Sequence, residues 1–150
     1  MIQRMQSVYL LVVTILLIVC MCTPVGAYIA EDYSVSKFTN LCIVSADGVK
    51  DYAPWAMFVI LVVAALLSFT TIFMFKKRML QIRMTIFSTI LLVGYYATLI
   101  TFIFMLKDDS MTFSASWTLC LPFVAIILNW LAIRAIGKDE VLVKAYDRLR

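Results

Sequence analysis

Four long apolar stretches occupy most of the 150-residue chain, and none of them contains a charged residue or a histidine. They cover approximately residues 8–30, 55–75, 84–106 and 115–133. Each has about 20 residues, the length that an α-helix needs to cross the hydrocarbon core of a bilayer at ~1.5 Å per residue. Hydrophobic residues make up 64 % of the chain and charged residues 15 %, whereas soluble domains are about half apolar and a quarter charged. We therefore expect an all-α membrane protein, an antiparallel four-transmembrane-helix bundle that forms one domain.

The connections between these spans differ in charge. Ten of the 13 Lys and Arg residues lie before the first span, in the 76–83 connection or after the last span. The other three lie in residues 31–54 and 107–114, beside six acidic residues. Because basic connections are retained in the cytoplasm, the sequence predicts a multi-pass protein with both termini cytoplasmic.

The longest connection contains a β-like run at residues 38–45, followed by Asp47-Gly48. This dipeptide is favoured in tight hairpin turns. We expect a short β-hairpin in this first outer loop.

The C-terminal tail comprises residues 137–150. Gly137, at its start, is expected to end the helix of the fourth span. Val141, Ala145 and Leu149 then recur at helical spacing beside basic residues. This pattern is typical of an amphipathic helix that lies on the cytoplasmic membrane surface.

The cytoplasmic basic residues are expected at one membrane level and form a candidate patch. We favour the interpretation that these residues set the topology and contact anionic lipid. Docking of an acidic cytoplasmic partner is the alternative. The residues are Arg4, Lys76, Lys77, Arg78, Arg83, Arg134, Lys138, Lys144, Arg148 and Arg150.

Small and weakly polar residues at helical spacing are candidates for packing within the bundle, because membrane helices associate through close backbone approach. Asn129 is the most polar side chain within any span and is expected to point inward. A polar cavity around Asn129 and a homodimer face are the alternatives to simple packing. The candidate packing residues are Ala64, Ser68, Gly94, Ala97, Thr98, Thr101, Ala125, Asn129 and Ala132.

The chain lacks the residues on which most catalytic mechanisms depend. There is no histidine, the spans contain no carboxylate, and the four glycines are not clustered. Hydrolase, NTPase, metalloprotease and ion-coupled transporter functions are therefore disfavoured, and no metal or other cofactor is expected.

The four cysteines, Cys20, Cys22, Cys42 and Cys120, are all expected on the outer side. Four-helix disulfide-forming enzymes that use a quinone have this topology. In this chain Cys20-Met21-Cys22 occurs in place of the Cys-x-x-Cys pair of those enzymes. No basic residue lies near Cys20 or Cys22 to lower the pKa of a thiol. Packing by small apolar side chains is the favoured interpretation. A Cys42–Cys120 bridge and redox catalysis are the alternatives.

Short motifs at both ends of the chain are specific when taken together. They are Ile2-Gln3-Arg4, Arg134-Ala135-Ile136, Lys138-Asp139-Glu140 and Asp147-Arg148-Leu149-Arg150. With these motifs the whole chain resembles the domain-of-unknown-function family DUF4293, although Gly137 stands where a basic residue would be expected. The resemblance implies a small four-span protein of the bacterial inner membrane. It implies no activity and no functional residues.

The sequence favours a non-enzymatic accessory or scaffold subunit that docks through its cytoplasmic face. Its expected partners are the bilayer, anionic lipid at the cytoplasmic face, and a membrane-protein partner or further copies of the chain. No nucleic-acid partner is expected. The alternatives are a binder or transporter of lipid or an apolar small molecule, using Asn129, Thr98 and Thr101, and a quinone-linked thiol–disulfide oxidoreductase.

Overall fold

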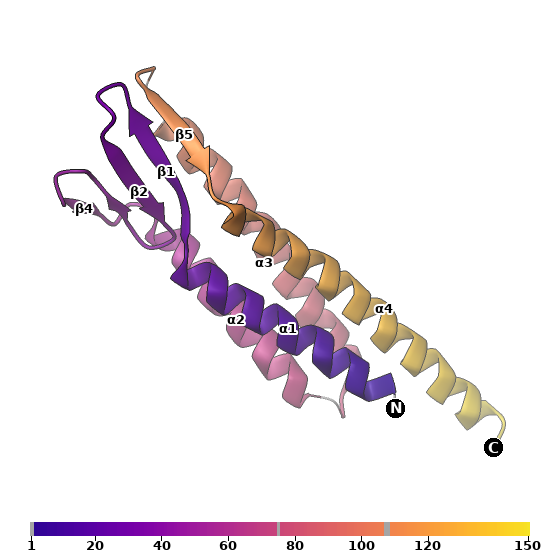
Figure 1. Ribbon diagram of the computed structural model, residues 1–150. Coiled ribbons are helices and arrows are strands. Elements are labelled where there is room, and N and C mark those ends of the chain that lie inside the picture. The colour runs from indigo at the N-terminus through magenta and orange to yellow at the C-terminus, as the bar shows by residue number, and fades with distance from the viewer. Residues whose placement is uncertain (1, 75, 107–108) are drawn as a thin grey trace.

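The structure is a computed structural model that describes residues 2–74, 76–106 and 109–150; for residues 2–4 only the backbone is described. Four long helices dominate it (Figure 1): α1 (Ile2–Cys22), α2 (Trp55–Phe73), α3 (Arg78–Met105) and α4 (Cys120–Arg148). Successive helices run in opposite directions, and α1 and α3 each pack against both α2 and α4. All four are long and apolar enough to cross a membrane, so the four long apolar helices expected from the sequence are confirmed.

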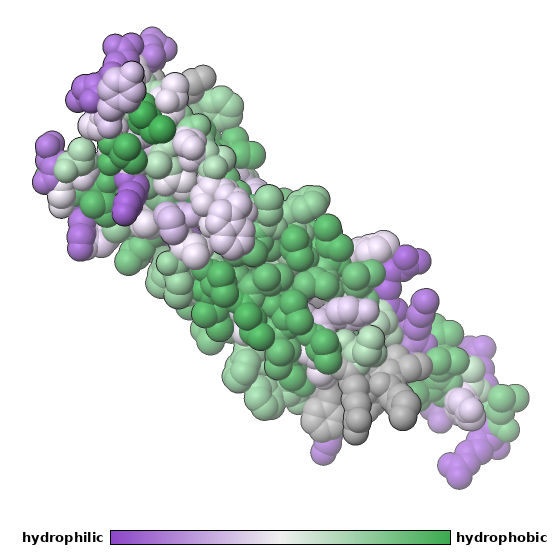
Figure 2. Space-filling view, in the orientation of Figure 1, coloured by the Kyte–Doolittle hydropathy of each residue, from purple (hydrophilic) through white to green (hydrophobic). Residues whose placement is uncertain are grey.

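The two ends of this bundle differ. Both chain termini lie at one end, which we call the terminal end, and a small sheet covers the other, the sheet end (Figure 1). On the face seen in Figure 2, a hydrophobic surface covers the middle of the molecule, between hydrophilic ends. This distribution fits a bundle surrounded by lipid.

The sheet is larger than the predicted hairpin. Its strands pair antiparallel in the order β4-β3-β2-β1-β5. They are β1 (Pro24–Ala30), β2 (Val35–Thr39), β3 (Ile43–Val44), β4 (Lys50–Asp51) and β5 (Met111–Ala115). The expected hairpin at Asp47-Gly48 is present as the antiparallel pair β3–β4. It is part of a larger sheet because the 107–114 connection supplies β5, which pairs with β1.

The first spanning helix is therefore shorter than the apolar stretch 8–30, since helix α1 ends at Cys22. The Thr23 hydroxyl donates a hydrogen bond of 2.8 Å to the Val19 carbonyl at the end of the helix. Pro24 has no N–H to continue the helical ladder, and β1 begins there. Strand β1 continues the uncharged run of the helix before it, so the apolar stretch read from the sequence included both. The fourth span likewise begins later than predicted, because residue 115 ends β5 and a 3-10 turn, η1 (Trp117–Leu119), precedes α4.

An aromatic cluster fills one face of the sheet. The ring centroids of Tyr28, Phe38 and Phe113 lie 5.1–6.3 Å apart. Phe102 and Leu106, near the end of α3, pack against the same core. The Tyr28 hydroxyl is buried without a hydrogen-bond partner among the described residues, and burial raises the pKa of this hydroxyl.

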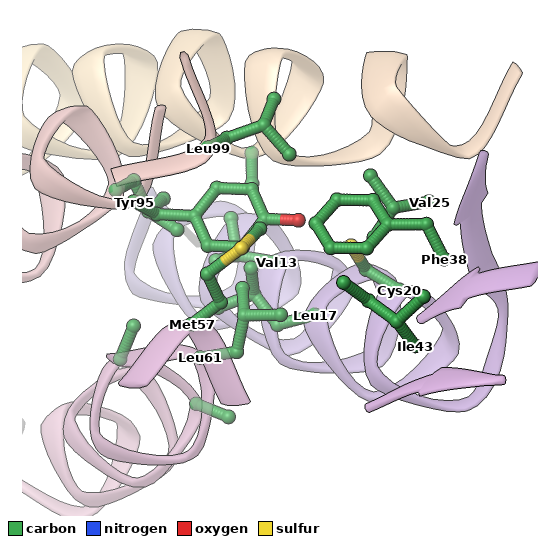
Figure 3. Packing of buried hydrophobic residues seen from close by; sticks show 14 of the residues in the cluster. Val13, Leu17, Cys20, Val25, Phe38, Ile43, Met57, Leu61, Tyr95 and Leu99 are labelled. Carbon is green, nitrogen blue, oxygen red and sulfur yellow. The ribbon is translucent and has the colours of Figure 1, made fainter. Parts of the chain in front are cut away.

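A chain of buried hydrogen bonds attaches the sheet to the bundle. Asn40, in the turn between β2 and β3, donates to the Cys20 carbonyl at 2.7 Å. The Tyr95 hydroxyl of α3 donates to the Asn40 side-chain oxygen, also at 2.7 Å. In Figure 3 this hydroxyl points from the bundle toward Phe38 of the sheet. The two bonds connect α1, the sheet and α3 at one point in the core.

The bundle core changes character between its two ends. Toward the sheet end it contains large apolar side chains such as Leu17, Met57 and Leu61 (Figure 3). Toward the terminal end many buried side chains are polar, and Ser68 and Ser88 lie 3.3 Å apart across α2 and α3. The buried polar residues of the four long helices are Gln6, Thr14, Ser68, Thr71, Gln81, Thr85, Ser88, Asn129 and Asp139. Most of the hydroxyls donate to carbonyls of their own helices, which lets the helices approach closely.

The candidate packing residues divide into two groups. The members on α2 and α4 lie in the core: Ala64, Ser68, Ala125, Asn129 and Ala132. The prediction for α3 was wrong, because Ala97 and Thr101 are exposed, Gly94 and Thr98 are only half-buried, and a Cβ on Gly94 would meet nothing within 4 Å. The buried face of α3 consists of Gln81, Thr85, Ser88, Leu92, Tyr95 and Leu99.

The C-terminal tail does not form a separate helix. Helix α4 continues through Gly137 to Arg148 without a break. Ile136 and Asp139, on either side of Gly137, are both buried against the bundle. This packing holds the glycine in the helix, so the predicted break at Gly137 was wrong.

Two glycines provide a test of the packing. A Cβ at Gly26 would lie 2.7 Å from the Ser114 carbonyl oxygen and from the Phe113 ring. We expect Gly26→Ala to lower the free energy of unfolding by roughly 1–3 kcal/mol, because the backbone of β5 must shift. Gly94→Ala should be neutral or stabilising, by up to ~1 kcal/mol, since alanine favours a helix. Thermal unfolding in detergent measures both, and a larger loss at Gly94 would contradict the packing described for α3.

Asn40 provides a test of the attachment between the sheet and the bundle. Asn40→Ala removes the acceptor of the Tyr95 hydroxyl and leaves the Cys20 carbonyl with only the longer bond of 3.3 Å from the Thr23 hydroxyl, so we expect a loss of ~1–3 kcal/mol in the free energy of unfolding. Tyr95→Phe, which leaves only the Asn40 oxygen unpaired, should cost less. Thr112→Val on the exposed side of β5 is the control. An Asn40 variant as stable as this control would show that the hydrogen-bond chain does not hold the sheet.

Candidate functional site

Asp139 ties three helices together at the terminal end. Its carboxylate accepts a hydrogen bond of 3.1 Å from the Gln6 amide of α1 and lies 4.0 Å from the Arg78 guanidinium of α3. Arg78 also donates to the Asp139 backbone carbonyl at 3.2 Å, and Gln6 donates to the Ala135 carbonyl. Asp139 is 7 % exposed, so its charge is balanced by these partners and not by water. This contact fixes α4 against α1 and α3 where α4 leaves the bundle.

A cleft of about 910 Å³ opens beside this contact. One wall is the start of α3 with the two residues before it, and the other wall is the part of α4 after Asp139. Arg78 reaches both walls through its bonds to Asp139. The cleft is lined by Lys76, Lys77, Arg78, Met79, Leu80, Arg83, Glu140, Val143, Lys144 and Asp147.

The cations of this cleft are not equivalent. Lys144 pairs with Glu140 at 2.9 Å, and Arg78 is bound to Asp139. Lys76, Lys77 and Arg83 are exposed and form no ion pair with any residue that the structure describes. Three cations are thus available to an external anion.

The predicted basic patch is therefore divided. Five residues of the predicted patch line the cleft. Arg134 lies outside it, and its guanidinium is 4.7 Å from the centre of the Trp130 ring. Arg134 and Lys138 border a separate hollow beside Tyr9. Arg148 and Arg150 are exposed at the end of the chain. The side chain of Arg4 lies outside the described residues.

The final part of α4 projects beyond the bundle. Every residue from 141 to 150 is exposed, and we call this segment the α4 extension. On one side of the extension, Val143 and Asp147 line the cleft. The opposite side is apolar, and we call it the docking face: Val141, Leu142, Ala145 and Leu149.

The four cysteines differ in burial. All four are free. Cys20 is buried in the core, Cys42 is half-buried beside Thr39, and Cys22 and Cys120 are exposed. Only Cys20 thus has the packing role favoured for Cys20, Cys22 and Cys120, and the structure does not contain the alternative Cys42–Cys120 bridge.

The residues proposed to line an internal cavity do not converge. Asn129 is fully buried, and neither of its amide atoms has a hydrogen-bond partner among the described residues. Thr101 is exposed and donates to the Ala97 carbonyl of its own helix. Thr98 donates to Gly94 in the same way. Only Asn129 of the three faces the core.

Sequence reasoning missed Asp139 as a buried contact, because the expected break at Gly137 placed it at the start of a surface helix. It also missed the polar face of α3. A signal was present, since Gln81, Thr85 and Ser88 are spaced four and three residues apart, in line with Leu92 and Tyr95. Such spacing marks one side of a helix.

The comparisons with known proteins agree with the sequence motifs. The family model described as a domain of unknown function (DUF4293) matches residues 2–149. The chain therefore belongs to this family, as the resemblance indicated. A search of the curated proteins finds no match.

Asp139 can be tested directly. Asp139→Ala removes the acceptor for Gln6 and Arg78, so we expect a loss of ~1–3 kcal/mol in the free energy of unfolding and faster amide hydrogen exchange in α4 after residue 135. Asp139→Asn keeps an acceptor and should lose less. Asp147→Ala removes the same charge from an exposed position and is the control. Equal effects of the two alanine variants would contradict the role of Asp139.

Proposed function

We propose that this protein is a non-enzymatic accessory or scaffold protein of the bacterial inner membrane, which binds a partner protein through the docking face of the α4 extension. The observation that carries the proposal is the continuity of α4 through Gly137. A continuous helix carries the docking face beyond the end of the bundle (Figure 1). A helix lying along the membrane would have buried the same side chains in lipid.

The docking face has the spacing of a helix-binding surface. Val141, Ala145 and Leu149 follow one another at intervals of four residues, and Val141 and Leu149 are 68 % and 88 % exposed. Two shallow hollows of about 490 and 500 Å³ lie along this side of the helix. Apolar side chains gathered on one side of an exposed helix mark a contact surface for another protein.

The charges around the docking face indicate the kind of partner. Lys138, Lys144 and Arg148 border its two hollows. We propose that the partner presents an amphipathic helix whose apolar stripe is flanked by acidic residues. A second copy of this chain would instead bring like charges together, which disfavours a homodimer through this face.

The orientation follows from the basic residues. The terminal end carries the cations of the cleft, together with Arg134, Lys138, Arg148 and Arg150, and the positive-inside rule places such an end in the cytoplasm. The docking face would then meet cytoplasmic or membrane-bound partners. The sheet would face the opposite compartment.

Site-specific photocrosslinking in the native host tests the proposal. A benzoylphenylalanine at position 141 or 145 should give a discrete adduct with one protein, whereas the same group at position 147, on the opposite side of the helix, should not. Adding Leu149→Asp should abolish the adduct while the protein still accumulates in the membrane, because a charge is costly in an apolar contact.

Three results would contradict the proposal. They are equal adducts at positions 145 and 147, adducts with lipid only, and an adduct with a second copy of the chain. The last result would assign the docking face to self-association.

A further inference from the structure

We infer that the cleft between the start of α3 and the α4 extension binds the phosphate headgroup of an anionic phospholipid. This goes beyond the docking function, because the cleft lies on the opposite side of α4 from the docking face. Val143 and Asp147 line the cleft, whereas Val141 and Leu149 form the docking face.

The charge of the cleft selects an anion. Five cationic side chains and two acidic ones line it, and Glu140 is already paired with Lys144. Lys76, Lys77 and Arg83 remain without a partner among the described residues. Arginine and lysine side chains that converge in a concave site bind phosphate oxygens through charge-assisted hydrogen bonds.

The apolar part of the lining favours a lipid over a soluble anion. Met79, Leu80 and Val143 share the cleft with the cations, and Met79 is 53 % exposed. A free phosphate gains nothing from these side chains. The glycerol and first acyl carbons of a phospholipid would cover them, while the headgroup meets the lysines.

The cleft lies at a level where phospholipid headgroups are available. Its first wall begins at Lys76, just before α3, and continues into that helix, and both α2 and α3 are long enough to span a membrane. A site at the end of spanning helices lies at headgroup level, where phospholipid is always present. Its two walls are held together by the bonds between Arg78 and Asp139, so the site exists before the lipid binds and little ordering is needed.

The experiment uses the full-length protein in a neutral detergent. Short-chain phosphatidylglycerol is titrated, and the rise in melting temperature gives the affinity. Short-chain phosphatidylcholine, inorganic phosphate and a polyglutamate peptide are titrated in parallel. The test variant is Lys77→Gln with Arg83→Gln, and the matched control is Arg148→Gln with Arg150→Gln, which removes the same charge from exposed positions outside the cleft.

We expect saturable stabilisation by phosphatidylglycerol and little by phosphatidylcholine. The cleft variant should weaken this binding roughly 25-fold, because each of the two cations contributes about fivefold at a membrane surface, and the control variant should match the wild type. All the substituted side chains are exposed and unpaired among the described residues, and unchanged melting temperatures without lipid would show that the variants fold.

Four results would overturn the inference. Equal weakening in both variants would show non-specific attraction. Stabilisation by inorganic phosphate as strong as by phosphatidylglycerol would show a soluble anion as the ligand. Preferential saturation by polyglutamate would point to an acidic protein segment, and absence of any phosphatidylglycerol effect would show that the cleft holds no lipid.

Discussion

The unbroken backbone of α4 determines the arrangement of the terminal end. A glycine within a helix costs about 1 kcal/mol relative to alanine. Burial of the Ile136 side chain contributes roughly 1.5–3 kcal/mol, and Asp139 adds its bonds to Gln6 and Arg78. The packing on either side of Gly137 is therefore strong enough to keep the helix intact. The cleft and the docking face both depend on this result, because they occupy opposite sides of the segment that follows.

The two ends of the bundle use different interactions to serve different purposes. At the sheet end, Asn40 and Tyr95 join an aromatic sheet to an apolar core. At the terminal end, the core is rich in small hydroxyl and amide side chains, and a charged contact at Asp139 completes it. Interhelical contacts between such uncharged polar side chains are individually weak in membranes, on the order of 0.6 kcal/mol. The contact at Asp139, between charged groups, is the stronger attachment at this end.

The sequence was sufficient for features that depend on local hydropathy. The number of long apolar helices follows from four uncharged stretches, and Asn129 faces inward as its polarity indicated. The sheet could not be predicted in full, because β1 pairs with β5 more than 80 residues away and hydropathy cannot reveal such pairing. The buried face of α3 was misassigned because we selected the face that carries small residues such as Gly94. The face that is buried instead follows the series of residues that runs through Thr85 and Tyr95. The basic residues were identified, but their division between the cleft and the rest of the surface required the course of α4.

A distance measurement across Gly137 tests the central claim most directly. Spin labels at positions 127 and 145 would be placed in a variant whose four native cysteines are replaced, and measured by pulsed electron resonance in lipid nanodiscs. The two positions are 18 residues apart, so a continuous helix predicts a narrow distribution near about 27 Å between the backbone sites. A broad distribution, or one centred well below this value, would show that the chain bends at Gly137 and would contradict both proposed binding surfaces.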